Sequence, residues 1–171
     1  MKRTLTIQII IILCLAAPAL AQWSTPVRLS NPGGHADPQI LAHGDTLHVV
    51  AEDFGPPDRI GYFRSTDRGL TWSNLRVLSE DSSQTLFPKM IGDGNGLMVL
   101  WRNSFYGGGL NIGYATSSNN GITWSSARYV FSPNRADLLY YSVSGVNSDV
   151  NIIFNGWDGD SLSFYAMKST D

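Results

Sequence analysis

The sequence predicts an all-β fold built from a repeated four-stranded unit. An octapeptide at residues 65–72, Ser-Thr-Asp-Arg-Gly-Leu-Thr-Trp, returns at residues 117–124 as Ser-Ser-Asn-Asn-Gly-Ile-Thr-Trp and begins again at Ser169. Its serines stand at positions 65, 117 and 169, a period of 52 residues, which indicates an array of similar units. With 17 glycines, 11% aromatic residues and only 15% charged residues, the composition is typical of short buried strands joined by tight turns.

The octapeptide predicts a hairpin turn held by its own side chains. Asp67 stands two residues before a glycine, where a carboxylate can accept hydrogen bonds from the backbone N–H groups of the turn. Gly69 supplies a positive φ without steric cost, and Trp72 can open the next strand with its ring across the turn. The residues expected to have this structural role are Ser65, Asp67, Gly69, Trp72, Ser117, Asn119, Gly121, Trp124, Ser169 and Asp171.

Residues 1–21 are predicted to be a signal peptide. Lys2 and Arg3 precede a mostly apolar run at residues 5–15, and a small-x-small cleavage site ends at Ala21. A membrane anchor is the alternative, but this run is shorter than the roughly 20 residues that a span needs. We therefore expect a secreted or cell-surface protein, cut after Ala21, whose mature part is residues 22–171.

Composition and spacing exclude several classes of partner and cofactor. The formal net charge is −2 and no basic stripe is present, so we expect no nucleic-acid binding. The predicted mature chain contains no stretch that would span a membrane. His35, His43 and His48 follow no metal-ligand spacing, and no phosphate-binding loop is found, so neither a metal nor another cofactor is expected.

The same order of strands recurs in each period. In the first period, Leu47, Val49 and Ala51 alternate with more polar neighbours, which is typical of a half-buried strand. The predicted strands are 38–42, 46–52, 59–65 and 72–78 in the first period, 87–92, 97–102, 110–117 and 124–131 in the second, and 138–144, 149–155 and 161–169 in the third. Loops are expected between the second and third strands, at 53–58, 103–109 and 156–160.

Four short antiparallel strands per repeat, arranged radially, make a β-propeller. Kelch and WD40 repeats are less suitable alternatives, because the glycine pair 107–108 and the Trp157-Asp158 dipeptide each occur once. The chain contains about three blades, whereas propellers close with about four to eight. We expect the N-terminal part of a longer protein, and the alternative is a short protein that closes by oligomerising.

The first octapeptide matches Ser-x-Asp-x-Gly-x-Thr-Trp at every signature position, and the second differs in having Asn119 in place of the aspartate. This motif resembles the Asp-box, or BNR repeat, of the sialidase superfamily, and the resemblance covers roughly residues 23–171. It implies a sialidase-like β-propeller, six-bladed when complete, of which residues 22–171 form about three blades. In that family the boxes lie away from the active site.

We expect a ligand site on the face that collects the loops between second and third strands, opposite the octapeptide turns. The first repeat places His35, Asp37, Glu52, Asp53, Asp58 and Arg59 on this face. The second repeat places Asp81, Arg102, Asn103, Phe105 and Tyr106 there, and the third places Arg135, Asp137, Asn155, Trp157, Asp158 and Asp160.

The resemblance implies sialidase chemistry, which uses an arginine cluster for the substrate carboxylate, an acid/base aspartate and a tyrosine nucleophile activated by glutamate. By position, Asp58 is the preferred match for the acid/base aspartate and Asp53 is the second choice; both could instead be turn-capping or solvated. Ala36 stands where the family has its first arginine, which argues against catalysis. The expected substrate contacts are Arg102, Trp157, Arg59 and Tyr106.

Two functions remain open from the sequence. The first is a secreted exo-α-sialidase or related glycoside hydrolase that acts on acidic glycans. The second is a non-catalytic propeller that binds glycans or proteins, or serves as a spacer in a larger surface or secreted protein. For the individual residues, Arg102 could also form an ion pair between blades, and Trp157 could stack on a sugar ring. A glycan or glycoprotein is the expected partner.

Overall fold

A computed structural model describes most of the chain after residue 22. The described residues are 23–30, 32–79, 84–93, 96–104, 110–130, 140–146, 149–158 and 160–169. The predicted signal peptide lies outside them, as do Asp81, Phe105, Tyr106, Arg135, Asp137 and Asp171.

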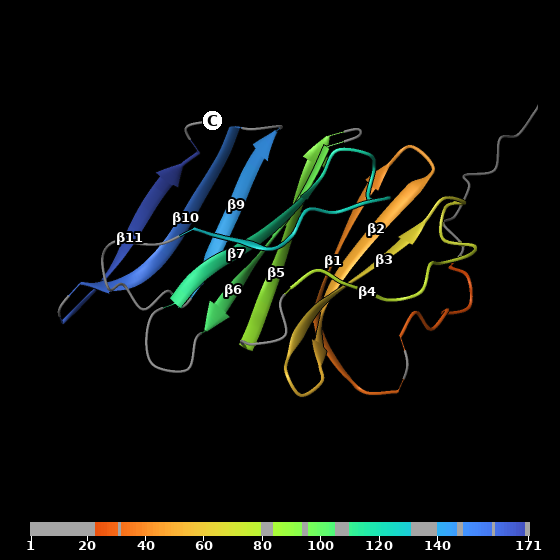
Figure 1. Cartoon of the computed structure of the whole chain (residues 1–171), viewed down its shortest axis with the longest axis horizontal. Coiled ribbons are helices and arrows are strands. Elements are labelled where there is room, and N and C mark those ends of the chain that lie inside the picture. Colours follow the sequence, from red (N-terminus) through yellow and green to blue (C-terminus); the bar gives the residue numbers. More distant parts are fainter. Residues whose placement is uncertain are drawn as a thin grey trace, which may run out of the picture.

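The described residues form three antiparallel sheets, each a meander of consecutive strands (Figure 1). The first sheet contains β1 (Gly34–His43), β2 (Thr46–Phe54), β3 (Arg59–Ser65) and β4 (Arg76–Val77). The second contains β5 (Gln84–Asp93), β6 (Gly96–Ser104), β7 (Leu110–Ser117) and β8 (Arg128–Val130), and the third β9 (Tyr141–Val146), β10 (Asp149–Asp158) and β11 (Ser161–Lys168). The all-β prediction is confirmed, and no helix in the described part of the chain could cross a membrane.

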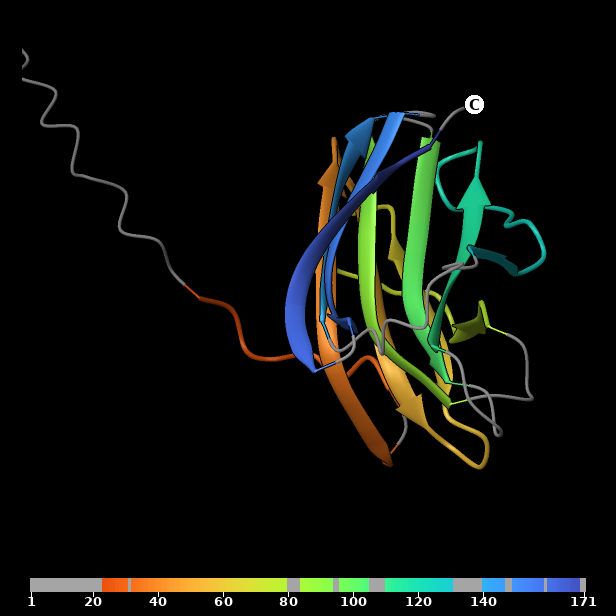
Figure 2. The same ribbon diagram turned by 90° about the vertical axis from the view of Figure 1, so that its left-hand side faces the viewer.

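The first strand of each sheet lies innermost. β1 contacts β5, and β5 contacts β9, while the three strands point the same way in Figure 1. Figure 2 shows the short outer strands, β4 in yellow-green and β8 in teal, on the side of the molecule away from β1. This is the arrangement of partial propeller blades. It also brings the beginnings of β1, β5 and β9 to one end of the molecule.

The hydrophobic core lies between the blades. The cluster between the first and second sheets contains Val50, Ile60, Tyr62, Leu78, Val99, Trp101 and Ala115. The cluster between the second and third sheets contains Leu100, Ile112, Tyr141, Val150, Ile152 and Phe154. Trp101 is fully buried, as its alternating strand predicts. Since each strand alternates its side chains between two faces, every internal blade contributes to two such clusters.

The octapeptide turns are held by side-chain hydrogen bonds. The Ser65 hydroxyl accepts from the Gly69 N–H at 2.8 Å and donates to Asp67 Oδ1 at 2.7 Å. Asp67 Oδ1 also accepts from the Thr71 N–H at 2.8 Å, and the Trp72 indole N–H donates to the Gly69 carbonyl at 3.0 Å. The turn therefore satisfies its own polar groups within eight residues.

The second turn repeats this pattern with an amide in place of the carboxylate. Asn119 Oδ1 accepts from the Thr123 N–H at 2.9 Å, and the Ser117 hydroxyl accepts from the Gly121 N–H at 2.9 Å. The third copy begins in the same structural position, because the Ser169 N–H donates to the Val150 carbonyl at 2.8 Å and the Val150 N–H donates to the Ser169 hydroxyl at 3.0 Å.

The second turn also connects two blades. Asn120 Oδ1 lies 3.0 Å from Nε2 of His48, whose Nδ1 lies 2.8 Å from the Tyr62 hydroxyl. The Arg64 side chain donates to the Asn120 carbonyl at 2.8 Å. His48 is fully buried, and burial lowers its pKa, so the ring is held in its neutral form between the hydroxyl and the amide. The turn at Gly121 is therefore packed directly against the first blade.

The fourth strands are shorter than predicted. Strands were expected at 72–78 and 124–131, but regular pairing begins only at Arg76 and Arg128. The Ser73 hydroxyl accepts from the Arg64 N–H at 3.0 Å, and the Ser125 hydroxyl accepts from the Thr116 N–H at 3.1 Å. A serine side chain thus takes the place of a backbone carbonyl in the ladder and delays the regular strand.

The second strands are longer than predicted. The residues expected in loops at the ends of these strands, Asp53, Asn103, Trp157 and Asp158, lie within β2, β6 and β10. In the third sheet, Trp157 pairs with Leu162 and Asp158 with Ser161, so the antiparallel ladder continues almost to the turn. The loops were predicted from turn-forming residue types, and residue type alone does not show how far the backbone pairing of a strand extends.

Acid should destabilise the first turn selectively. Hydrogen bonds from the Thr71 side chain and backbone, together with that of Ser65, lower the pKa of Asp67 to about 2, below its ordinary value of 3.8. Because the folded-state pKa is the lower one, this stabilisation is present above about pH 4 and is lost as the pH falls towards 2. Asp67→Asn, which copies the second turn, should remove this dependence. Melting temperatures measured from pH 5 to 2 would contradict the prediction if the two proteins gave parallel curves.

Candidate functional site: a carboxyl cluster at the end of the inner strands

The first strands of the first two blades carry the same bulge. The register of β1 shifts between Ala36 and Gln39, and that of β5 between Leu86 and Lys89. Asp37 and Phe87 occupy equivalent places in these bulges, with positive φ angles of 46° and 55°, and each precedes a proline. The bulge is therefore part of the repeat. In the first blade it presents an exposed carboxylate, and in the second an aromatic ring.

A buried glutamate lies beside Asp37. Glu52 is only 2% exposed and lies opposite Ala36 in the β1–β2 ladder. Its Oε1 accepts a 2.5 Å hydrogen bond from the Phe87 N–H of the next blade. Burial raises the pKa of Glu52 above its ordinary value, and the hydrogen bond from Phe87 opposes this effect. The charge and hydrogen bond of Asp37 raise the pKa further, as does the charge of Asp58.

The arrangement can hold and transfer a proton. A neighbouring negative charge disfavours ionisation of a buried carboxyl group, which is why the charge of Asp37 helps to raise the pKa of Glu52. Paired carboxyl groups whose environments drive their pKa values apart are typical of acid–base sites. Among the described residues, no group of three or more histidine, cysteine, aspartate or glutamate side chains is arranged to hold a metal ion. We call Asp37, Glu52 and Asp58 the carboxyl cluster, because the charges of both aspartates raise the pKa of Glu52.

Phe87 joins this cluster to the other two blades. Its N–H donates to Glu52 of the first blade, and its carbonyl accepts from the Tyr141 hydroxyl of the third blade at 2.7 Å. The Arg102 guanidinium lies 5.5 Å from the centre of the Phe87 ring, and the ring of Tyr140 lies 5.9 Å from it. A cation and an exposed aromatic ring thus lie against Phe87, and both kinds of group can contact a sugar.

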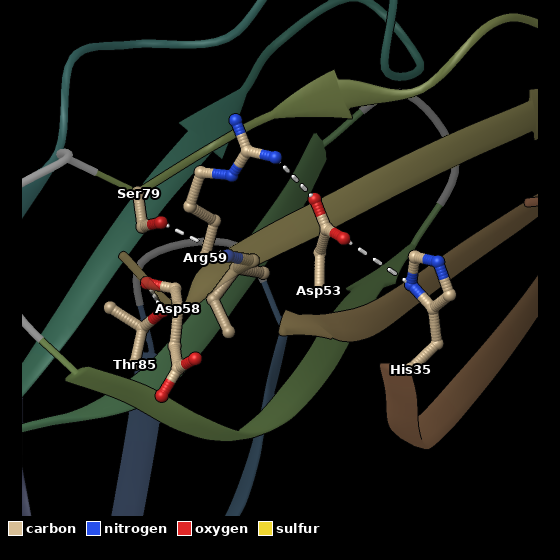
Figure 3. A network of polar contacts seen from close by, with 7 residues as sticks. His35, Asp53, Asp58, Arg59, Ser79 and Thr85 are labelled. Carbon is tan, nitrogen blue, oxygen red and sulfur yellow. Dashed lines mark hydrogen bonds and ion pairs between the residues drawn. The ribbon is translucent and has the colours of Figure 1, made fainter. Parts of the chain in front are cut away.

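Asp53 belongs to a different network, on the other face of β2. Its Oδ2 accepts from Arg59 Nη2 at 2.8 Å, and its Oδ1 lies 3.6 Å from His35 Nδ1 (Figure 3). The carboxylate is nearly buried and is neutralised by the arginine. The expectation that Asp53 is a solvated loop residue is therefore wrong, because strand pairing places it directly opposite both partners.

The side chains of Asp58 and Asp53 point in different directions. Figure 3 shows its carboxylate pointing away from the Asp53–Arg59 pair. Its backbone is fixed to the second blade, since the Thr85 hydroxyl donates to the Asp58 carbonyl at 2.9 Å. The two aspartates that the sequence singled out therefore lie in different environments, and Asp58 is the one that acts on Glu52.

A groove of about 700 Å³ borders the Asp53–Arg59 pair. It lies between the N-terminal residues 27–30 and 32–33 and the first blade. Its lining includes Arg28, His35, Asp53, Arg59, Trp72 and Asn74. The aspartate on this wall is already paired with the Arg59 guanidinium. The carboxyl cluster is the stronger candidate site.

Other expected site residues have different outcomes. The Arg102 guanidinium lies over the Phe87 ring, whereas Arg59 is engaged by Asp53. Trp157 lies in β10, and its side chain is outside the described part of the chain, as is Tyr106. The sequence placed Asp37 and Glu52 on this face without selecting them. Two residue pairs in the sequence could have pointed to Asp37: aspartate–proline at position 37 and phenylalanine–proline at position 87. Each marks the bulge of its repeat.

Comparisons with known proteins support the fold. No protein-family model and no curated protein matches this chain. Among solved structures, it is similar to the catalytic domain of a GH62 α-L-arabinofuranosidase from Coprinopsis cinerea, with a TM-score of 0.51 and 13% identity over 82% of this chain and 56% of that one. It is also similar to an α-L-arabinofuranosidase from Podospora anserina in complex with cellotriose, with a TM-score of 0.53 and 7% identity over 82% and 55% of the two chains.

This chain therefore spans about half the length of the solved structures that it matches. These enzymes have a five-bladed β-propeller-like fold. The expected six blades of a sialidase-like propeller stay a prediction. At such low identity the similarity concerns architecture, and the described residues have the fold of partial β-propeller blades of the type seen in these glycoside hydrolases.

Proposed function

We propose that this chain forms blades of a carbohydrate-directed propeller with glycoside hydrolase activity, and that Asp37 and Glu52 are its proton-transfer pair. The observation that carries the proposal is the place of the buried Glu52 opposite Ala36, next to the exposed bulge residue Asp37, together with the raised pKa of Glu52. Glycoside hydrolysis generally uses carboxyl groups that exchange a proton with the glycosidic oxygen or the attacking water, and Asp37 is the exposed member of this pair that would supply one of them. The carbohydrate-active neighbours in fold support the same class of substrate.

Each member of the cluster has a distinct role in this proposal. Asp37 is exposed and contacts the substrate or the attacking water. Glu52 is buried, so it acts through Asp37, sharing a proton with it and fixing its position. Asp58, the acid/base residue expected from the sequence, contributes negative charge that helps to raise the pKa of Glu52. Asp53 has no catalytic role here, because Arg59 neutralises it.

The finer proposal is an acidic glycan as substrate and secretion of the protein. The octapeptides resemble Asp-boxes of sialidases, and residues 1–21 have the pattern of a signal peptide. The Arg102 guanidinium over the Phe87 ring is a group of the kind that binds substrate carboxylates. A non-catalytic glycan-binding or spacer propeller is the second candidate, favoured by Ala36 at the place of the family's first arginine.

Turnover and binding of a small substrate panel would decide between these functions. The protein should hydrolyse either an aryl α-sialoside or an aryl α-L-arabinofuranoside. If the acidic-glycan proposal is right, adding free sialic acid should inhibit this hydrolysis. Binding of oligosaccharides, measured by calorimetry, without turnover of any substrate would establish the non-catalytic candidate instead. If the protein neither bound nor hydrolysed any of these carbohydrates, the carbohydrate-directed proposal as a whole would be contradicted.

A further inference from the structure

The tryptophan of the second octapeptide fills a place between two blades. Trp124 packs edge-on against Tyr62, with ring centroids 4.9 Å apart and planes inclined at 69°. Tyr62 belongs to β3 of the first blade and is almost fully buried in the cluster with Val50, Ile60 and Leu78. The octapeptide therefore supplies a hydrophobic contact with the preceding blade in addition to its own turn.

The second blade contains an equivalent place for such a ring. Tyr62 pairs with Arg76 in the first sheet, and Tyr114 pairs with Arg128 in the same way in the second. On the opposite wall, Ala115 pairs with Val99 in the second sheet, and Met167 pairs with Ile152 in the third. Strand register thus identifies Tyr114 as the counterpart of Tyr62, one 52-residue period later.

A groove lies at that equivalent place. It encloses about 400 Å³ between the second and third blades. Its walls are mostly apolar side chains and include Met98, Leu100, Tyr114, Val130, Ile152 and Met167. Ser169, the first residue of the third octapeptide copy, also lines it. The groove therefore begins beside the position from which a third octapeptide turn would start.

The third sheet has an edge strand to which a further strand could pair. In the first two sheets the third strand pairs with a short fourth strand, β4 or β8. Within the described residues, β11 pairs only with β10. Its other edge presents backbone N–H and C=O groups that a further strand could pair with.

We propose that this groove binds the tryptophan side chain of a third copy of the repeat, with the strand after that tryptophan pairing along β11. The ring takes the place against Tyr114 that Trp124 takes against Tyr62. Leu100, Val130 and Met167 enclose it. The proposal follows from the contact already formed between the first two blades, and it does not depend on the proposed function.

A graft of the chain's own repeat tests this directly. Residues 120–131 are copied after Asp171, so that Ser169 opens a complete octapeptide followed by its strand. The extension should raise the melting temperature of the full chain by about 5–10 °C, because it buries a tryptophan and pairs a strand edge. A control extension with alanine in place of that tryptophan should lose at least half of this increase. Equal melting temperatures for the two extensions would overturn the proposal.

A second variant separates the groove from the strand pairing. The extension with tryptophan should have a higher melting temperature than the extension with alanine. In a Tyr114→Ala background this difference in melting temperature should become smaller, because one wall of the proposed site is removed. An undiminished difference would place the ring elsewhere and overturn the assignment. Size-exclusion chromatography of the unextended chain addresses a different occupant: a dimer that the extension dissociates would show that a second copy fills the groove, which also contradicts the proposal.

Discussion

Replacing Asp37 with asparagine is expected to reduce kcat for glycoside hydrolysis by about 10²–10⁴-fold, the usual effect of removing a general acid or base. The amide keeps the size of the side chain and its place on the bulge of β1, so KM should change little. Initial rates measured over a range of substrate concentrations would separate the two parameters. Glu52→Gln should also lower kcat, while its amide oxygen can still accept the hydrogen bond from Phe87.

The matched control is Asp93→Asn. Asp93 is an exposed aspartate at the opposite end of β5, in the turn that leads to β6. It should leave kcat and KM unchanged. If Asp37→Asn lowered the rate no more than the Asp93 variant does, the carboxyl cluster would have no part in the chemistry.

Gly121→Ala is expected to be strongly destabilising. Gly121 has a φ of +75°, where a Cβ costs roughly 1–2 kcal/mol. A Cβ there would also lie 3.1 Å from His48 Nδ1 and in severe overlap with the Tyr62 hydroxyl. Both groups belong to the buried contact between the first two blades, so overpacking should add about 1–3 kcal/mol. Urea denaturation should show a total loss of about 2–5 kcal/mol.

Gly69→Ala is the matched control for this experiment. Gly69 occupies the same place in the first octapeptide and has a φ of +89°. A Cβ there meets the flexible end of Leu47 at 3.3 Å instead of a buried hydroxyl. This variant should lose only the backbone cost, about 1–2 kcal/mol. Equal losses for the two variants would mean that the second turn does not pack against Tyr62 and His48 as described.

The sequence predicted best what depends on neighbouring residues. Ser65, Asp67 and Gly69 satisfy one another within a single turn, so their pattern alone predicts the hydrogen bonds. The fourth strands were placed several residues too early, because Ser73 and Ser125 look like ordinary strand residues until their hydroxyls are seen to replace ladder carbonyls.

The candidate site was harder to predict because it depends on contacts between blades. Glu52 and Phe87 are 35 residues apart in the chain, and only the packing of the second blade on the first brings them together. Asp53 follows Glu52 directly, yet alternation along β2 sends the two side chains to opposite faces. Periodicity predicted that such faces exist, but not which carboxyl group would meet arginine and which would meet another carboxyl group.

The most direct test of the account is the titration of the Glu52 carboxyl group. The chain contains two glutamates, Glu52 and Glu80, so selective ¹³C labelling of glutamate gives two carboxyl resonances to follow by NMR. One should titrate above the ordinary value of 4.5 and move to lower pH in Asp37→Asn, because a neighbouring negative charge has been removed. If both resonances titrated at ordinary values and ignored the substitution, Glu52 and Asp37 would not share a proton and the proposed pair would be wrong.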